Sequence, residues 1–318
     1  MELTGNAFAF PWEVDLMAWL QNSLPDSLIS VFSRFSFFGE EAFMFLLLGF
    51  LYWSYDKRAA KKAGIVIVMI CVWAPMIKNA VLRLRPYMVH EQIGLRRAIA
   101  ADADLNDISA QGYSFPSQHA ASVSGLGSAI AAVFKKPWLS WLTVILSLLV
   151  GVSRVIVGAH YPTDVLCGWI FGLLVFAVVS ALERKIDDKR LFYGLMLLTA
   201  LPGLFFCKSA DYYSVLGLLI GFVFGTQVEE KHVNFENTSH PVRAVLRILG
   251  GGLVFFALNT VLKLPFSAGF LSSGTFAALL VRCARYAVIA FVCFAVYPMV
   301  FRLTAKIGNK DYRRNEPE

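Results

Sequence analysis

Charged residues are scarce in this chain. Asp, Glu, Lys and Arg make up 16% of the 318 residues, whereas 57% are hydrophobic. A soluble domain carries about 25% charged residues, and the mean hydropathy here is +0.61. The composition excludes an ordinary soluble protein. It predicts an all-α polytopic membrane protein, for which we expect no nucleic-acid partner.

Paired cysteines and paired carboxylates are also lacking. The five cysteines form no CxxC pair, so the sequence predicts neither a disulfide framework nor a zinc site. The polar clusters described below contain no paired carboxylates, which argues against a two-metal hydrolase. We therefore expect no metal and no cofactor.

The first 40 residues lack a basic n-region, and we expect no cleaved signal peptide. They contain Glu13, Asp15 and Asp26 and are too polar to span a bilayer. Apolar residues could line one face of an interfacial helix there: they are Trp12, Leu16, Trp19 and Leu20.

Apolar stretches near the length needed to cross a bilayer predict about nine transmembrane helices. They lie near 41–55, 63–85, 118–134, 138–157, 163–182, 191–207, 212–227, 243–263 and 278–302. The expected divisions are an N-terminal interfacial segment (1–40), a core (41–185), additional transmembrane helices (186–303) and a basic tail (304–318).

Basic residues are concentrated in alternate loops, which orients the chain. If these loops are cytoplasmic, the N-terminus lies outside and the C-terminus lies in the cytoplasm. The basic loop residues include Lys57, Arg58, Lys61, Lys62, Lys135, Lys136, Arg184, Lys185, Lys189 and Arg190. Three polar clusters then fall together on the outer face, in an integral membrane protein whose location is expected to be the cell membrane.

The first cluster is Lys78 and Arg85, followed by Pro86. Seven residues are nearly two helical turns, so on one helix these cations would share a face about 10 Å apart. Pro86 would end the span. Two cations that extend toward the membrane surface are the simpler alternative.

The second cluster, Pro116-Ser117-Gln118-His119, opens an apolar run. Ser117 is a plausible N-cap, and helix N-termini bind anions. His119, in the first turn, could donate a proton to a leaving oxygen. An ordinary helix cap beside an interfacial histidine is the alternative.

The third cluster lies in Ser153–Asp164, SRVIVGAHYPTD. Arg154 can hold phosphate oxygens bidentately, His160 can act as a nucleophile, and Asp164 can hold its other ring nitrogen. Pro162 is placed to start the next span. Ionisable residues at span boundaries are costly and indicate function, so the three clusters together predict one phosphate-handling site.

These three motifs, Lys78-x6-Arg85-Pro86, Pro116-Ser117-Gln118-His119 and Ser153-Arg154-x5-His160-x3-Asp164, resemble the tripartite signature of the type-2 phosphatidic acid phosphatase superfamily. The resemblance covers roughly residues 40–185. It implies metal-independent hydrolysis of a lipid phosphate or diphosphate, with the active site facing the periplasm, exterior or lumen.

The resemblance also implies roles for single residues. His160 would attack phosphorus to form a phosphohistidine, Asp164 would orient His160, and His119 would protonate the leaving group and then activate water. The transferring phosphoryl group would be stabilised by Lys78, Arg85, Ser117, Arg154 and the backbone N–H of Gln118.

The chain departs from the family pattern in two ways. Gln118 stands where the family usually has glycine, which could alter the pocket. The layout of nine spans is more similar to glucose-6-phosphatase and sphingosine-phosphate phosphatases than to six-span relatives. Hydrolysis of a small soluble phosphomonoester, or a non-catalytic role in lipid-phosphate binding or transport, remain alternatives. The sequence does not give the oligomeric state.

Overall fold

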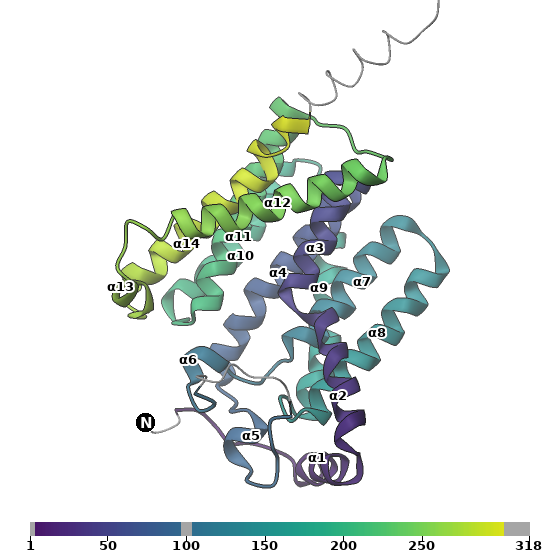
Figure 1. The fold of residues 1–318 in the computed structure, drawn as a ribbon, viewed down its shortest axis with the longest axis vertical. Helices are drawn as coiled ribbons and strands as arrows, with labels where there is room; N and C mark the ends of the chain where they lie inside the picture. Colours follow the sequence, from purple (N-terminus) through teal and green to yellow (C-terminus); the bar gives the residue numbers. More distant parts are fainter. Residues whose placement is uncertain (1–3, 97–103, 302–318) are drawn as a thin grey trace, which may run out of the picture. The chain divides into compact units, whose positions relative to one another are not determined.

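The computed structural model describes residues 4–96 and 104–301, which fold as helices without a β-strand (Figure 1). The predicted tail, 304–318, lies outside the described residues. The α-helices are α1 Pro11–Ser23, α2 Asp26–Phe35, α3 Glu41–Phe50, α4 Lys57–Val81, α5 Pro86–Val89, α6 Ile108–Gln111, α7 Gln118–Phe134, α8 Pro137–Ile156, α9 Pro162–Lys185, α10 Lys189–Ala200, α11 Ala210–Val228, α12 Pro241–Val261, α13 Ala268–Ser272 and α14 Phe276–Phe291.

Within the described chain, 6 helices are long and apolar enough to cross a membrane, or up to 7 if one bent pair counts as a span. The six are Lys57–Val81, Pro137–Ile156, Pro162–Lys185, Ala210–Val233, Pro241–Val261 and Phe276–Phe301. The bent pair joins Asp26–Gly39 to Glu41–Tyr55 at 49°. The predicted span near 118–134 coincides with α7, which has 17 residues, whereas the one predicted near 191–207 is represented by α10, which has 12 residues and ends at Ala200. Both helices are shorter than the six candidate spans.

The chain divides into two compact units. The first contains Met1–Phe45 and Lys62–Tyr212, and the second contains Leu46–Lys61 and Tyr213–Glu318. All residues of the three sequence clusters belong to the first unit.

Helices α7, α8 and α9 of the first unit pack against one another (Figure 1). Glycine allows α7 and α9 to approach closely: a Cβ at Gly172 would lie 2.2 Å from the carbonyl oxygen of Ala121 and 2.3 Å from Oγ of Ser124. A Cβ at Gly168 would lie 2.5 Å from the carbonyl oxygen of Ser117. The start of α7, with the second cluster, is thereby held against the start of α9.

An apolar cluster lies beside these helix ends and includes residues of the N-terminal helix. Val14 and Met17 of α1 pack with Val155 of α8 and Val165 of α9. The exposed side of α1 carries Trp12, Leu16 and Trp19, whereas Leu20, predicted on the same face, packs against this cluster. Glu13 and Gln21 instead point into the protein and are buried.

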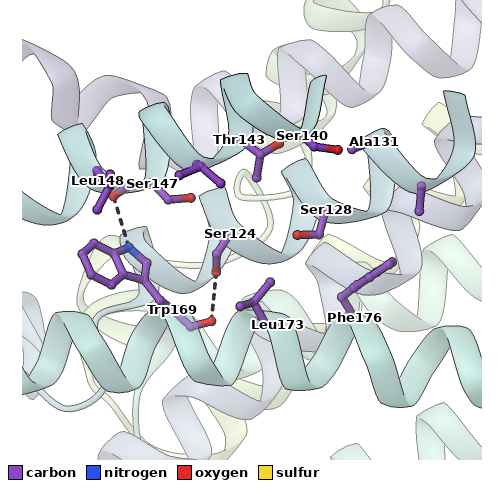
Figure 2. Close-up of a pocket in the computed structure, with 12 residues that line it drawn as sticks. Ser124, Ser128, Ala131, Ser140, Thr143, Ser147, Leu148, Trp169, Leu173 and Phe176 are labelled. Carbon is purple, nitrogen blue, oxygen red and sulfur yellow. Dashed lines mark hydrogen bonds between the residues drawn. The ribbon is translucent and has the colours of Figure 1, made fainter. Parts of the chain in front are cut away.

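A groove of about 480 Å³ lies farther along α7, α8 and α9. Figure 2 shows hydroxyl groups of Ser124, Ser128 and Ser147 among apolar side chains, with the indole of Trp169 at one end. The Trp169 indole N–H donates to the carbonyl oxygen of Ser147 at 3.1 Å. None of the residues predicted for the phosphate site lines this groove.

The prediction that Lys78 and Arg85 share one helix is wrong, because α4 ends at Val81. Leu82 has a left-handed backbone, with φ of 58°. Asn6 pairs with the chain here: its N–H donates to the carbonyl oxygen of Leu82 at 2.8 Å, and the N–H of Leu84 donates to its carbonyl oxygen at 2.9 Å. Arg85 is extended before Pro86, as steric conflict with proline favours.

The second unit is held by close helix packing and by buried ion pairs. A Cβ at Gly217 of α11 would lie 2.2 Å from the carbonyl oxygen of Cys283 in α14. Glu229 is fully buried and pairs with Lys57 at 2.9 Å and Lys61 at 2.8 Å.

We predict that Gly172→Ala destabilises the protein, because the new methyl group meets a backbone carbonyl that cannot move freely. Overpacking typically costs about 1–3 kcal/mol, so the unfolding temperature in detergent should fall by several degrees. Gly194→Ala is the matched control, since a Cβ there meets nothing within 4 Å; a helical Gly→Ala change otherwise stabilises by roughly 0.5–1 kcal/mol. Equal unfolding temperatures for the two variants would contradict this account of the α7–α9 packing.

Candidate functional site

His160 lies in the tight connection between α8 and α9. Gly158 has a left-handed backbone with φ of 77°, and a Cβ there would lie 2.4 Å from the carbonyl oxygen of Gly94. The N–H groups of Ala159 and His160 donate to the carbonyl oxygen of Arg154 at 3.1 and 3.2 Å. The connection turns His160 inward, where it is 1% exposed.

Asp164 lies in the first turn of α9, which begins at Pro162 as predicted. Its Oδ2 accepts from the N–H of Tyr161 at 2.9 Å and lies 3.7 Å from Nδ1 of His160. That distance is longer than a hydrogen bond, and Nδ1 has no hydrogen-bond partner among the described residues. The predicted His160–Asp164 neighbourhood is therefore present, with the two groups not in hydrogen-bond contact.

Asp164 instead forms a close ion pair with Arg83, which the sequence interpretation missed. Nη1 of Arg83 lies 2.7 Å from Oδ1 of Asp164, and Nη2 lies 2.8 Å from Oε2 of Glu13. Arg83 stands between Lys78 and Arg85 in the first cluster. The presence of Arg83 as a third cation at the same span boundary was the sequence feature that could have indicated its role.

Glu13 is the second buried carboxylate near this loop. Burial raises its pKa, but hydrogen bonds from the Thr163 side chain and from the N–H groups of Phe10 and Thr163, with the charge of Arg83, outweigh burial and lower the pKa overall. Glu13 is therefore ionised at neutral pH. Its partners Arg83 and Thr163 are 70 and 150 residues away in the sequence. No local sequence pattern therefore predicts that Glu13 contacts them.

The second cluster occupies the start of α7. Ser117 is at the N-cap position, as predicted, but its hydroxyl makes no capping bond and has no partner among the described residues. Its N–H donates to the carbonyl oxygen of Asp164 at 2.9 Å, which joins α7 to α9. Gln118 Nε2 lies 3.3 Å from a carboxylate oxygen of Glu41. His119 packs against Gly39, where a Cβ would lie 2.8 Å from the His119 Cβ.

The first cluster is oriented by main-chain carbonyl groups. Nζ of Lys78 donates to Tyr113 at 2.5 Å, and Nε of Arg85 donates to Gly112 at 2.9 Å. Nη1 of Arg85 donates to the carbonyl oxygen of Ala159, beside His160, at 3.2 Å. Although the two cations do not share a helix, both contact the connection before α7. Carbonyl contacts orient a cation without neutralising its charge.

Arg154 is in the last turn of α8 and is 2% exposed. Its Nη1 lies 3.1 Å from Oγ of Ser36, which in turn lies 2.6 Å from Oγ of Ser153. Ser36 is a further residue that sequence reasoning missed, because it lies in a short 3₁₀ turn with no motif around it.

The electrostatic environment of His160 is cationic. Burial, followed by the positive charges of Arg85, Lys78, Arg154 and His119, lowers the pKa of His160 well below its ordinary value. His160 is therefore neutral at pH 7, with a ring nitrogen able to act as a nucleophile. Among residues 4–96 and 104–301, no group of three or more His, Cys, Asp or Glu side chains could hold a metal ion. Cations around a neutral imidazole suit a phosphoryl group.

Two family models match the chain. One, described as the PAP2 superfamily, matches residues 62–187, and the other, described as the PAP2 superfamily phosphatase transmembrane extension, matches residues 213–309. The first match contains all three clusters, whereas Glu13 and Ser36 lie outside both matches.

Several bacterial proteins are similar to the chain. Undecaprenyl-diphosphatase BcrC of Bacillus subtilis is 31% identical over 174 residues, which cover 52% of this chain and 81% of the relative. Decaprenylphosphoryl-5-phosphoribose phosphatase of Mycobacterium tuberculosis is 30% identical, covering 53% of this chain and 89% of the relative. Lipid A 1-phosphatase of Rhizobium johnstonii is 32% identical, covering 40% and 53%. No solved structure matches the chain.

Proposed function

Because the chain belongs to the PAP2 superfamily and is a phosphatase of that family, we propose that it hydrolyses a lipid phosphate or diphosphate through a phosphohistidine intermediate. The reaction takes place on the non-cytoplasmic face and uses no metal ion. The substrate is a membrane lipid, which agrees with the lipid substrates named for the similar bacterial phosphatases.

The observation that carries this proposal is the set of cations whose positive charge acts on His160. Arg85, Lys78, Arg154 and His119 all act on this one buried imidazole, although they come from four separate parts of the chain. A phosphoryl group in transfer spreads negative charge over three equatorial oxygens, and positioned cations stabilise that charge. The start of α7, with the N–H of Gln118, supplies further donors for an anion.

In the first step, Nε2 of His160 attacks phosphorus. A nitrogen–phosphorus bond forms as the bond to the leaving oxygen breaks, and His119 gives its proton to that oxygen. Asp164 favours the tautomer with a proton on Nδ1, which leaves the Nε2 lone pair free. The products are the dephosphorylated lipid, or a lipid monophosphate from a diphosphate, and phosphohistidine.

In the second step, neutral His119 takes a proton from water as the water oxygen attacks phosphorus. The nitrogen–phosphorus bond breaks, inorganic phosphate leaves, and His160 regains its lone pair. Lys78, Arg85, Ser117 and Arg154 contact the phosphoryl oxygens in both steps. Gln118, which replaces the usual glycine, keeps the N–H this role needs and points its side chain toward Glu41.

The basic residues at the helix ends of the first unit support the proposed side of the membrane. The site groups lie where α4 and α8 end and where α7 and α9 begin. The opposite ends carry basic residues, including Lys135 after α7 and Lys185 at the end of α9. Lys62 near the start of α4 lies 3.8 Å from Glu183 near the end of α9. Basic loops favour the cytoplasm, so the site faces the periplasm, exterior or lumen. Nine spans with an outside N-terminus remain our proposal for the topology.

The groove along α7, α8 and α9 supports a lipid rather than a soluble ester. Ser124 follows His119 by five residues and Trp169 follows Asp164 by five, a rise of about 7.5 Å on a helix. The groove therefore begins about one and a half helical turns from the proposed phosphate site, on the same three helices. It extends from there toward the other ends of these helices. A hydrocarbon chain attached to the bound phosphate would meet this apolar surface.

We predict that purified protein in detergent releases phosphate from lipid substrates in the presence of a metal chelator. The panel contains phosphatidic acid, sphingosine-1-phosphate, a polyprenyl diphosphate and glucose-6-phosphate. His160→Ala should lower kcat by on the order of 10³-fold or more, because it removes the nucleophile.

His240→Ala is the matched control, since His240 is exposed and lies outside the first unit. Turnover of glucose-6-phosphate alone would favour the soluble-ester alternative. Absence of turnover by folded protein would contradict the enzymatic proposal and favour lipid-phosphate binding or transport.

A second prediction concerns pH. Protonation of His160 removes its nucleophilic lone pair, so activity falls as the pH drops through the pKa of His160. Because burial and neighbouring cations lower that pKa, the fall in kcat assigned to His160 should lie below its ordinary value of 6.5. Profiles of kcat from about pH 5 to about pH 8 test this. A fall in kcat toward low pH that is centred above 6.5 and is the same for every substrate would contradict the proposed state of His160.

A further inference from the structure

We propose that Arg83 and Glu13 are positioning residues for the reaction: Glu13 neutralises Arg83, so that Asp164 keeps a net negative charge for His160. This inference rests on the roles proposed above for Asp164 and His160. It assigns a part in catalysis to α1, a helix outside the regions matched by the family models.

Arg83 is fixed from several directions. Its Nε donates to the carbonyl oxygen of Phe8 at 2.9 Å, and its Nη1 donates to Oγ1 of Thr163 at 2.8 Å as well as to Asp164. The guanidinium carbon lies 4.0 Å from the centre of the Tyr161 ring, within the range of a cation–π contact. Arg83 is 4% exposed. The Arg83 guanidinium group is thus held by hydrogen bonds along its edges and by the Tyr161 ring on one face. Because Asp164 is bound to this fixed group, its carboxylate has little freedom to rotate.

Glu13 is equally constrained. Oε1 accepts from the N–H of Thr163 at 3.0 Å and from its hydroxyl at 2.6 Å, while Oε2 accepts from the N–H of Phe10 at 3.0 Å and from Arg83 at 2.8 Å. These four contacts fill the acceptor sites of a carboxylate. Two of them go to Thr163, in the first turn of α9, so Glu13 also fixes the turn that carries Asp164.

The sum of the charges explains why a second carboxylate is needed. When His160 attacks phosphorus, its ring takes on positive charge, which a net negative neighbour stabilises. Arg83 lies 2.7 Å from Asp164, closer than the 3.7 Å between Asp164 and His160. Arg83 and Asp164 alone would sum to zero. With Glu13 the three buried groups sum to one negative charge.

The other charged groups facing His160 make this negative charge more important. Lys78 of α4, Arg85 before α5, His119 of α7 and Arg154 of α8 each disfavour positive charge on the imidazole. Asp164 of α9 opposes them. The cations that bind phosphate therefore penalise the developing imidazolium, and the Glu13–Arg83–Asp164 chain reduces that penalty.

A purely structural ion pair is the competing explanation, because breaking a buried ion pair is destabilising in any protein. The two explanations differ in what happens when both outer charges are removed. If Glu13 acts by neutralising Arg83, removing Arg83 as well should restore the net negative charge at Asp164. If the pair only holds the fold, removing both partners should do no better than removing one.

The test compares Glu13→Gln, Glu13→Asp, the double variant Glu13→Gln/Arg83→Gln and the control Asp15→Asn. Asp15 is exposed on the same helix, two residues from Glu13. We expect Glu13→Gln to lower kcat roughly 10- to 100-fold, the range seen when a carboxylate that orients a metal-bound histidine is removed, with KM changed much less than kcat. Glu13→Asp and the double variant should regain part of kcat, and Asp15→Asn should match the wild type. Thermal unfolding in detergent identifies variants that have lost the fold.

A measurement without turnover accompanies the kinetics. The ring nitrogens of ¹⁵N-labelled histidine report the tautomer of His160, whose signals are assigned by their loss in His160→Ala. At neutral pH we expect the Nδ1–H tautomer in the wild type and in Asp15→Asn, and a mixture of tautomers in folded Glu13→Gln.

The outcomes separate this inference from the proposed function. If Glu13→Gln matches Asp15→Asn in kcat and in ring signals, the inference is overturned. A double variant that folds but is slower than Glu13→Gln would also overturn it. If no protein hydrolyses any substrate but Glu13→Gln still changes the His160 tautomer, the positioning chain stands and the proposed function fails. Inactive protein with unchanged ring signals would refute both.

Discussion

The structure depends on keeping several cations beside one buried, neutral imidazole. Lys78, Arg85 and Arg154 would repel one another and disfavour a charged His160, yet the proposed phosphate site needs their charge. The protein orients the first two through main-chain carbonyl groups of residues 112–113 and 159, which fix the side chains while leaving their positive charge for a ligand. Its two buried carboxylates in this region, Glu13 and Asp164, both contact a fourth cation, Arg83.

Much of the site could be predicted from sequence because its groups lie at helix ends, where local signals are strong. Pro162 starts α9 and Ser117 precedes α7, as predicted, so Asp164 and His119 fall in first turns. The tripartite spacing identified the family that the comparisons then confirmed. Each of these features depends on a few adjacent residues.

The rest could not be predicted because it depends on contacts between distant segments. The spacing of Lys78 and Arg85 suggested one continuous helix, but Asn6 pairs with the chain after Val81 and the helix ends there. Glu13 was assigned to the polar part of an interfacial helix, and its buried partners lie in other motifs. Ser36 carries no motif of its own. Hydrophobicity predicted where helices lie, and it predicted about nine spans. In the described chain, six helices are long and apolar enough to cross a membrane, or seven if the bent pair counts as one span.

The central claim is that His160 carries the phosphoryl group between the two steps. Rapid acid quenching during turnover of a ³²P-labelled lipid phosphate tests it most directly. We expect label on the protein within the first turnover, on histidine in digested peptides containing residue 160, and none on His160→Ala. Multiple turnovers by the wild type without labelled protein at any quench time, or equal labelling of His160→Ala, would contradict the account.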